Sequence, residues 1–182
     1  MSKREYSARV QWQGKSWRLR VVDQILPDGT TAEKGVIDHP GSVVIVPLDG
    51  EQVLMLRQYR LSLDQGILEL PAGTREGDEP WLTCAQRELR EETGYQASEW
   101  TELGRVWPAP GLTNELMAVY LAQNLSPAPL PRDADEEIEV RKMPLDELVE
   151  MALNGQLQDA KSVVGVLRVA KHLNRLPVNH IG

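Results

Sequence analysis

The stretch from Gly73 to Tyr95, "GTREGDEPWLTCAQRELREETGY", predicts a helix that ends in a cluster of glutamates. Apolar residues recur at helical spacing between Glu79 and Thr93, at Leu82, Ala85 and Leu89. Asp78 is a suitable N-cap, and Gly94 is a typical stop after the last turn. We therefore expect an amphipathic helix that packs on the core by one apolar edge.

Three carboxylates, those of Glu88, Glu91 and Glu92, fall at the end of this helix within an arc of about 100°. A helix C-terminus carries partial negative charge, so each exposed carboxylate there costs roughly 0.3 to 1 kcal/mol, and the three also repel one another. Arg87 can orient Glu91 through an i,i+4 ion pair. A solvated charged face is the ordinary interpretation. A bound divalent cation would instead remove both penalties, and magnesium suits carboxylate and phosphate oxygens.

The composition excludes several classes of partner. Among 182 residues there are 20 basic and 27 acidic side chains, a net charge of −7, so no basic field is available for duplex nucleic acid or an anionic membrane. The first residues lack the apolar segment of a signal peptide, and the longest apolar run, "SVVIVPL", is too short to cross a bilayer. We expect a soluble, cytoplasmic protein with no nucleic-acid or membrane partner.

Short strand-like runs fill most of the remaining chain. Turn signals such as "PDGT", "HPG" and "LDGE" separate them, and no internal repeat or long linker divides the sequence. Two further helices are expected, over residues 144–155 and from residue 159 onward. This pattern predicts an α+β fold with a mixed or antiparallel sheet. Residues 1–38 are expected to form an N-terminal antiparallel β-hairpin arm, and residues 39–182 the main domain.

Nine positions of the opening stretch match a known motif. They fit the Nudix signature G-x5-E-x7-R-E-U-x-E-E-x-G-U, in which U is apolar or aromatic, at Gly73, Glu79, Arg87, Glu88, Leu89, Glu91, Glu92, Gly94 and Tyr95. The chain thus resembles the Nudix hydrolases. The resemblance implies an α/β/α sandwich around a mixed sheet, and a magnesium-dependent hydrolase of nucleoside diphosphates linked to another group, with manganese as an alternative ion.

The same resemblance implies roles for individual residues. Glu88 and Glu92 would bind the metal directly, and Glu91 would be a further ligand or act through water as a catalytic group. The backbone carbonyl of Ala72, in the segment "LPAG", would complete the metal site. A simple turn is the alternative interpretation of that segment.

Five segments outside the motif narrow the resemblance to the ADP-ribose, or ADP-sugar, pyrophosphatases. They are "LRQYR" (56–60), "LELPAG" (68–73), "PAPG…E" (108–115), "ADEEIEV" (134–140) and "DAKSVVGVL" (159–167). Pro110, fifteen residues after Tyr95, occupies a marker position of that subfamily. The resemblance implies hydrolysis of ADP-ribose, or of a related nucleoside diphosphate sugar, to AMP and ribose 5-phosphate.

Two arginines in "LRQYR" are suited to a diphosphate, because guanidinium groups bind phosphate through paired N–H groups. Strand alternation places Arg57 and Arg60 on opposite faces. The resemblance favours Arg60 as the substrate contact, and structural pairing is an equal alternative for Arg57. Glu115 is a further candidate beside the substrate and metal, although an ordinary carboxylate at the start of a strand is the more common role.

The acidic run "RDADEEIEV" (132–140) is most often a solvated loop. Similar enzymes carry a catalytic glutamate on a loop at this place. Counting back from "IEV" indicates Glu136, with Glu137 as the alternative. Either carboxylate would remove the proton of the attacking water.

The N-terminal hairpin contains Trp12 and Trp17 and resembles an arm that related enzymes exchange between subunits. The resemblance implies a homodimer in which an aromatic ring, here that of Trp17, stacks on the nucleobase. The alternative is that both tryptophans cover the core of their own chain.

Three other functions are alternatives to hydrolysis of ADP-ribose. GDP-mannose or another nucleoside diphosphate sugar is an alternative substrate, because pocket shape decides base and sugar. Removal of RNA caps is disfavoured by the acidic chain, which lacks a basic track for a single strand. A non-catalytic ADP-ribose-sensing module would be expected to carry a DNA-binding module and an eroded motif, whereas this motif is complete.

Overall fold

The computed structural model describes residues 6–131 and 137–176 of the chain. Its strands are β1 (Tyr6–Gln13), β2 (Arg18–Ile25), β3 (Thr31–Asp38), β4 (Ser42–Asp49), β5 (Gln52–Arg60), β6 (Gln65–Glu69), β7 (Ala72–Thr74), β8 (Tyr95–Val106), β9 (Met117–Pro127) and β10 (Ile138–Pro144). Its helices are α1 (Trp81–Thr93), α2 (Leu145–Asn154) and α3 (Ala160–His172).

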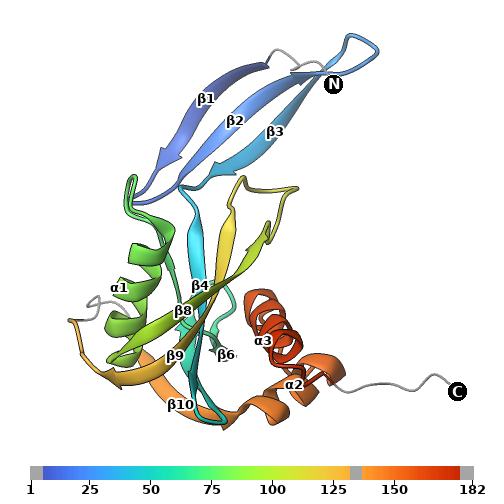
Figure 1. Cartoon of the computed structure of the whole chain (residues 1–182). Coiled ribbons are helices and arrows are strands. Elements are labelled where there is room, and N and C mark those ends of the chain that lie inside the picture. The colour runs from blue at the N-terminus through green and yellow to red at the C-terminus, as the bar shows by residue number, and fades with distance from the viewer. Residues whose placement is uncertain (1–5, 132–136, 177–182) are drawn as a thin grey trace, which may run out of the picture.

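The strands form two sheets (Figure 1). Strands β1, β2 and β3 make an antiparallel sheet of three, and the main sheet has seven strands in the order β10-β5-β4-β9-β8, with β6 paired to β5 and β7 to β4. Strands β4 and β9 run parallel, and the other pairs of the main sheet are antiparallel. The predicted mixed sheet is confirmed.

Helices cover both faces of the main sheet. Helix α1 lies on one side and helices α2 and α3 lie on the other (Figure 1). Strand β4 passes through the centre, and all of its residues except the last are buried, as expected for a strand covered on both faces. Alternate residues of β4 enter two cores, with Val43 and Ile45 facing α1 and Val44 and Val46 facing α3. The α/β/α sandwich is therefore confirmed.

Helix α1 starts at Trp81 rather than at Glu79. Asp78 does not cap it: the N-cap is Pro80, without a side-chain hydrogen bond. The cause is a turn just before the helix, in which the Glu79 N–H donates to the carbonyl oxygen of Glu76 (3.0 Å). This turn leaves the Glu79 side chain outside the helix.

The buried edge of α1 also differs in part from the prediction. Ala85 and Leu89 are fully buried as expected, but Leu82 is exposed and Cys84 is buried in its place. Leu82 lies in the first turn of α1. The helix ends at Gly94, which adopts the expected left-handed conformation with φ 78°.

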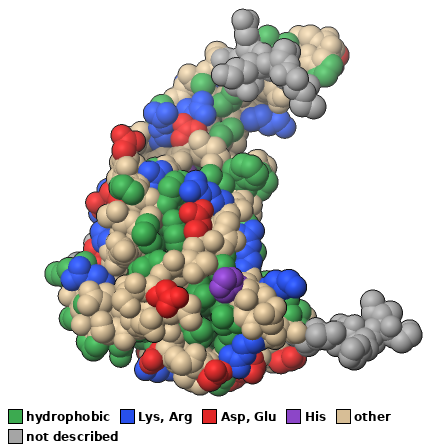
Figure 2. Space-filling view, viewed as in Figure 1, with side chains coloured by type: hydrophobic (Ala, Val, Ile, Leu, Met, Phe, Trp, Pro, Cys, Tyr) green, Lys and Arg blue, Asp and Glu red, His purple; other side chains and the backbone are tan. Residues whose placement is uncertain are grey.

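The N-terminal arm has one strand more than the predicted hairpin, since β3 pairs with β2 along its whole length. It rises from the main sheet as a narrower lobe (Figures 1 and 2). Ile37 joins it to the body by accepting a hydrogen bond from Asn114 N–H (3.2 Å) and donating one to Leu112 (2.9 Å). The division into an arm of residues 1–38 and a domain of residues 39–182 stays a prediction.

No helix within the described ranges is both long enough and apolar enough to cross a membrane.

Candidate functional site

A cavity of about 550 Å³ opens beside α1 at the edge of the main sheet. Five predicted site residues line it: Arg60, Ala72, Glu88, Glu91 and Glu115. Five charged residues that the sequence analysis left without a role also line it: Lys15, Glu69, Glu76, Asp159 and Lys161. Segments distant in sequence therefore meet here, from β5, β6, β7, α1 and the start of α3.

Arg87 organises the carboxylates of α1. Its guanidinium donates to Glu79 (3.1 and 3.0 Å), Glu88 (2.7 Å) and Glu91 (2.9 Å), and also to the carbonyl oxygen of Thr74 (3.2 Å). The expected i,i+4 pair with Glu91 is present. The hydrogen bond to Glu79 is the main reason that the pKa of Arg87 is raised above its ordinary value.

Arg87 thus offsets part of the repulsion between the carboxylates. The sequence analysis had expected a bound cation alone to do so. One positive charge faces three carboxylates, so this group still carries two net negative charges. An anionic group of oxygen atoms remains suited to a hard divalent cation.

Glu92 lies behind the cavity wall. Its side chain is buried, at 2% exposure, and one carboxylate oxygen accepts a hydrogen bond from the Ala72 N–H (2.9 Å). That bond joins the end of α1 to β7. It brings the Ala72 backbone and the glutamates into one neighbourhood, as the proposed metal site requires.

Gly73 makes room for Glu88. A Cβ atom at this position would lie 1.8 Å from the Glu88 carboxyl carbon, which no side chain tolerates. Among the described residues no three acidic, histidine or cysteine side chains converge as a ready metal site. The donor set nevertheless fits a divalent ion in its chemistry, because hard oxygen atoms with excess negative charge share the wall beside this glycine.

Arg60 lies on the opposite face of β5 from Arg57, as strand alternation predicts. Arg60 donates two parallel hydrogen bonds to Glu69 (2.8 and 2.7 Å), while Arg57 is exposed, does not line the cavity and pairs in register with Glu139 of β10. Glu115 accepts a hydrogen bond from the Ser42 hydroxyl (2.5 Å) at the cavity wall. The roles of these residues toward substrate stay predictions.

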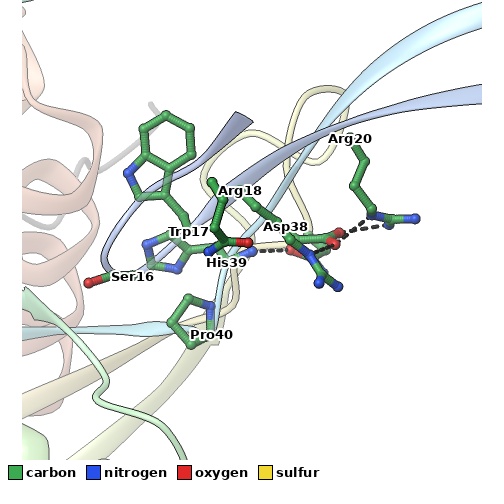
Figure 3. A pocket seen from close by; sticks show the side chains of 9 residues that line it. Ser16, Trp17, Arg18, Arg20, Asp38, His39 and Pro40 are labelled. Atoms are coloured by element: carbon green, nitrogen blue, oxygen red, sulfur yellow. Dashed lines mark hydrogen bonds and ion pairs between the residues drawn. The ribbon is translucent and has the colours of Figure 1, made fainter. Parts of the chain in front are cut away.

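Trp17 lines a second pocket, of about 620 Å³, at the junction of the arm and the main sheet (Figure 3). Ser16 lines both this pocket and the cavity beside α1, so the two spaces adjoin. The rings of Trp17 and Trp12 contact each other with centroids 4.4 Å apart, and both stay partly exposed. Neither ring belongs to the two core clusters among the described residues, and the stacking of Trp17 on a nucleobase stays a prediction.

The sequence analysis missed His39, a residue of this region, because its spacing from other histidines does not indicate a metal site. Its Nδ1 accepts a hydrogen bond from Gly41 N–H (3.1 Å) and lies 3.9 Å from a Glu115 oxygen. Burial lowers the pKa of His39, and Glu115 opposes that shift. The ring lines the second pocket next to Trp17 (Figure 3).

Of the two candidate bases, Glu136 lies outside the described residues. Glu137 is exposed, immediately precedes β10 and does not line the cavity. The assignment of a general base to either residue stays a prediction.

Comparisons with known proteins agree with this geometry. Residues 38–164 match the NUDIX domain model. The chain is 35% identical over 157 residues to a protein of Bacillus subtilis named ADP-ribose pyrophosphatase, covering 84% of each. It is 37% identical over 161 residues to a protein of the same name from Mycobacterium tuberculosis, covering 86% of this chain and 77% of the relative.

A solved structure described as an ADP compounds hydrolase has the same fold. It superposes with a TM-score of 0.82 at 22% identity, over 97% of this chain and 98% of that one. The motif on α1, the sandwich around it and these relatives agree: the chain belongs to the NUDIX family and is a Nudix hydrolase of the ADP-ribose pyrophosphatase-like subfamily.

Proposed function

We propose that the protein hydrolyses the diphosphate bond of ADP-ribose, yielding AMP and ribose 5-phosphate, with Mg²⁺ as its ion. The observation that carries the proposal is the charge arrangement of the cavity beside α1. Excess carboxylate at Glu88 and Glu91 shares that cavity with the Arg60 guanidinium. A diphosphate bound together with a divalent cation matches both kinds of charge.

The ion would be held by Glu88, Glu91, Glu92 and the Ala72 carbonyl. When bound, Mg²⁺ lowers the pKa of a water and neutralises phosphate charge. Arg87 orients Glu88 and Glu91 by donating hydrogen bonds to both. Nudix hydrolases generally use a divalent metal ion. Mn²⁺ is the ion to be tested as a substitute for Mg²⁺.

Arg60 is the proposed phosphate contact. Its bidentate pair with Glu69 fixes the plane of the guanidinium, and the fork geometry of arginine matches phosphate oxygens. Glu136 or Glu137 would accept the proton of the attacking water. Glu115, beside Ser42, would border the substrate.

The proposal extends to a homodimer formed through the N-terminal arm, with Trp17 stacking on the nucleobase. Large apolar side chains exposed along the arm support it: Val10, Trp12, Trp17 and Ile25. A dimer would cover such residues. A native mass near 20.4 kDa by gel filtration would contradict this part of the proposal.

One experiment tests the reaction. Purified protein is incubated with ADP-ribose, GDP-mannose, other nucleotide sugars and dinucleoside polyphosphates, with Mg²⁺, Mn²⁺ or chelator. ADP-ribose is expected to have the highest kcat/KM, and chelator should abolish turnover. Oxygen-18 water then locates the attacked phosphorus. Preference for GDP-mannose would replace the proposed substrate, and cytoplasmic location stays a prediction to be checked in cells.

A further inference from the structure

Glu69 at the end of β6 is a carboxylate buried to 1% exposure, and two cations share it. Arg60 donates to it through Nε and Nη2 at 2.8 and 2.7 Å, and Lys161 Nζ donates to it as well. A buried carboxylate is costly unless it is paired and hydrogen-bonded. Losing both cations would therefore leave Glu69 as an uncompensated charge.

Helix α3 holds Lys161 in place. Its N-cap, Asp159, accepts hydrogen bonds from Lys161 Nζ (2.8 Å) and from Ser162 N–H (3.1 Å). Ser162 is fully buried, and its hydroxyl oxygen accepts the N–H of Leu70 (2.7 Å), next to Glu69. The start of α3 is thereby fixed to the end of β6, so the Lys161 ammonium is a fixed partner of Glu69.

The two cations differ in exposure. The Arg60 side chain is 39% exposed, whereas that of Lys161 is 12% exposed. The pair with Glu69 uses two of the five N–H groups of Arg60. Both side chains line the cavity, but Arg60 is the more exposed and keeps three N–H groups beyond those that Glu69 accepts, whereas the less exposed Lys161 pairs with Glu69 and Asp159.

Charge balance explains why both cations are needed. Arg60 and Lys161 balance Glu69 and Asp159, so the four charges sum to zero. When the phosphate oxygens of a substrate draw Arg60 away, Lys161 still pairs with Glu69. Without Lys161, Glu69 would hold Arg60 more tightly, and the cluster would carry a net negative charge that repels phosphate.

We propose that Lys161 is a positioning residue for diphosphate binding: through Glu69 it aims the Arg60 guanidinium into the cavity and frees Arg60 to engage phosphate. This inference rests on the proposed function, since it takes a nucleoside diphosphate sugar as the ligand. It assigns to Lys161 an action on KM through Glu69, without direct contact with substrate.

The test compares steady-state kinetics of Lys161→Met, Lys161→Arg and Lys171→Met with ADP-ribose and saturating Mg²⁺. Lys161→Met should raise KM by about tenfold with kcat nearly unchanged. Lys161→Arg keeps the charge and should restore KM to within about threefold of the wild-type value. Lys171→Met is the matched control, because it removes an exposed lysine from the same helix outside the cavity. An unchanged KM in Lys161→Met would overturn the inference.

A Glu69→Gln background separates positioning from direct contact. With the buried charge removed, Lys161→Met should change KM by less than about threefold, because its effect is transmitted by Glu69. A tenfold rise in both backgrounds would mean that Lys161 binds phosphate itself, which contradicts the inference.

A second measurement covers the case in which Glu69→Gln does not fold. The NMR signal of Arg60 Nε–H in the ligand-free protein should shift in Lys161→Met and stay in place in Lys171→Met. An unmoved signal in Lys161→Met would overturn the proposed coupling.

Calorimetric titration of ADP-ribose in chelator separates this inference from the proposed reaction. Lys161→Met should bind about tenfold more weakly than the wild type. Wild-type protein that binds ADP-ribose but hydrolyses no nucleotide sugar would refute the reaction and leave the Lys161 comparison valid. Wild-type protein that neither binds nor hydrolyses any of them would refute both.

Discussion

Two charged clusters line the same cavity and are built from the same kinds of residue, yet they differ in net charge. On α1, Arg87 pairs with Glu79, Glu88 and Glu91, which leaves two negative charges in excess. At the start of α3, Lys161 and Arg60 balance Glu69 and Asp159. The excess negative charge on α1 suits a bound cation, whereas Arg60 of the balanced cluster can bind a phosphate. Residue type alone therefore does not decide what a charged cluster binds.

Removing one carboxylate from α1 should have the largest effect on activity. We expect Glu92→Gln to lower turnover by about a hundredfold or more, since a metal contributes several kcal/mol to such a reaction. Activity is measured at saturating Mg²⁺, with circular dichroism to confirm the fold. Glu147→Gln, on the exposed face of α2, is the control and should behave as wild type. Normal turnover in Glu92→Gln would refute the metal assignment.

Removing the cation of the α1 cluster should instead affect stability. Arg87→Met leaves three largely buried carboxylates without their shared partner and should lower the free energy of unfolding by about 2 kcal/mol in chelator. Mg²⁺ should then raise stability more in the variant than in the wild type. Urea denaturation measures both effects.

The control for that prediction is Arg141→Met, which breaks an exposed pair with Glu139 and should leave the free energy of unfolding close to that of the wild type. Equal losses in the two variants would mean that the α1 cluster contributes no more than an ordinary surface pair.

Gly73→Ala tests the space that the α1 cluster requires. The added Cβ would displace the Glu88 carboxylate, so we expect turnover to fall by about tenfold through misplacement of that ligand. Gly111→Ala is the control, because a Cβ there meets no atom within 4 Å. If Gly73→Ala keeps wild-type kcat and KM, the position of Glu88 is not critical.

A third charged cluster, on the arm, differs from both because its net charge is positive: two arginines face one carboxylate. Asp38 accepts hydrogen bonds from Arg20 (2.7 Å) and Arg18 (2.9 Å). The bond from Arg20, and then that from Arg18, outweigh burial and lower the pKa of Asp38. A depressed carboxyl pKa stabilises the fold above the unfolded value, about 3.9, and that stabilisation is lost as pH falls through the folded value.

Asp38→Asn should therefore cost about 1 kcal/mol of stability at pH 7. The difference from wild type should shrink as pH falls below about 4, because the wild-type carboxyl then becomes protonated. Urea denaturation at a series of pH values measures this difference. A difference that stays constant down to the lowest pH would contradict the role of the charged carboxylate.

Local patterns predicted the α+β class and the glutamate helix, because strand alternation, turn residues and helical spacing depend on residues close in sequence. The sandwich was implied by the resemblance that the Nudix motif carries. Local patterns failed where a turn or a short strand pairing overrides the conformational propensity of the residues. The turn that ends in Glu79 displaced the expected cap at Asp78, and the three-residue strand β7, which pairs with β4, was too short to predict.

The candidate site was predicted in part. Glu88 and Glu91 came from the motif, and the wider resemblance added Ala72, Arg60 and Glu115. Glu69, Asp159 and Lys161 lay in quoted segments without an assigned role. Their meaning depends on a contact between β6 and α3, and one sequence does not specify such pairing. The signal that could have found them is a charged residue inside an otherwise apolar segment, as in "LELPAG" and "DAKSVVGVL".

The contact between Lys161 and Glu69 joins residues 92 positions apart. During translation every strand of both sheets leaves the ribosome before α3, so a nascent chain lacks the ammonium group that balances Glu69. Competence to take up a nucleotide sugar should therefore arise late in synthesis, only when the final described helix has docked.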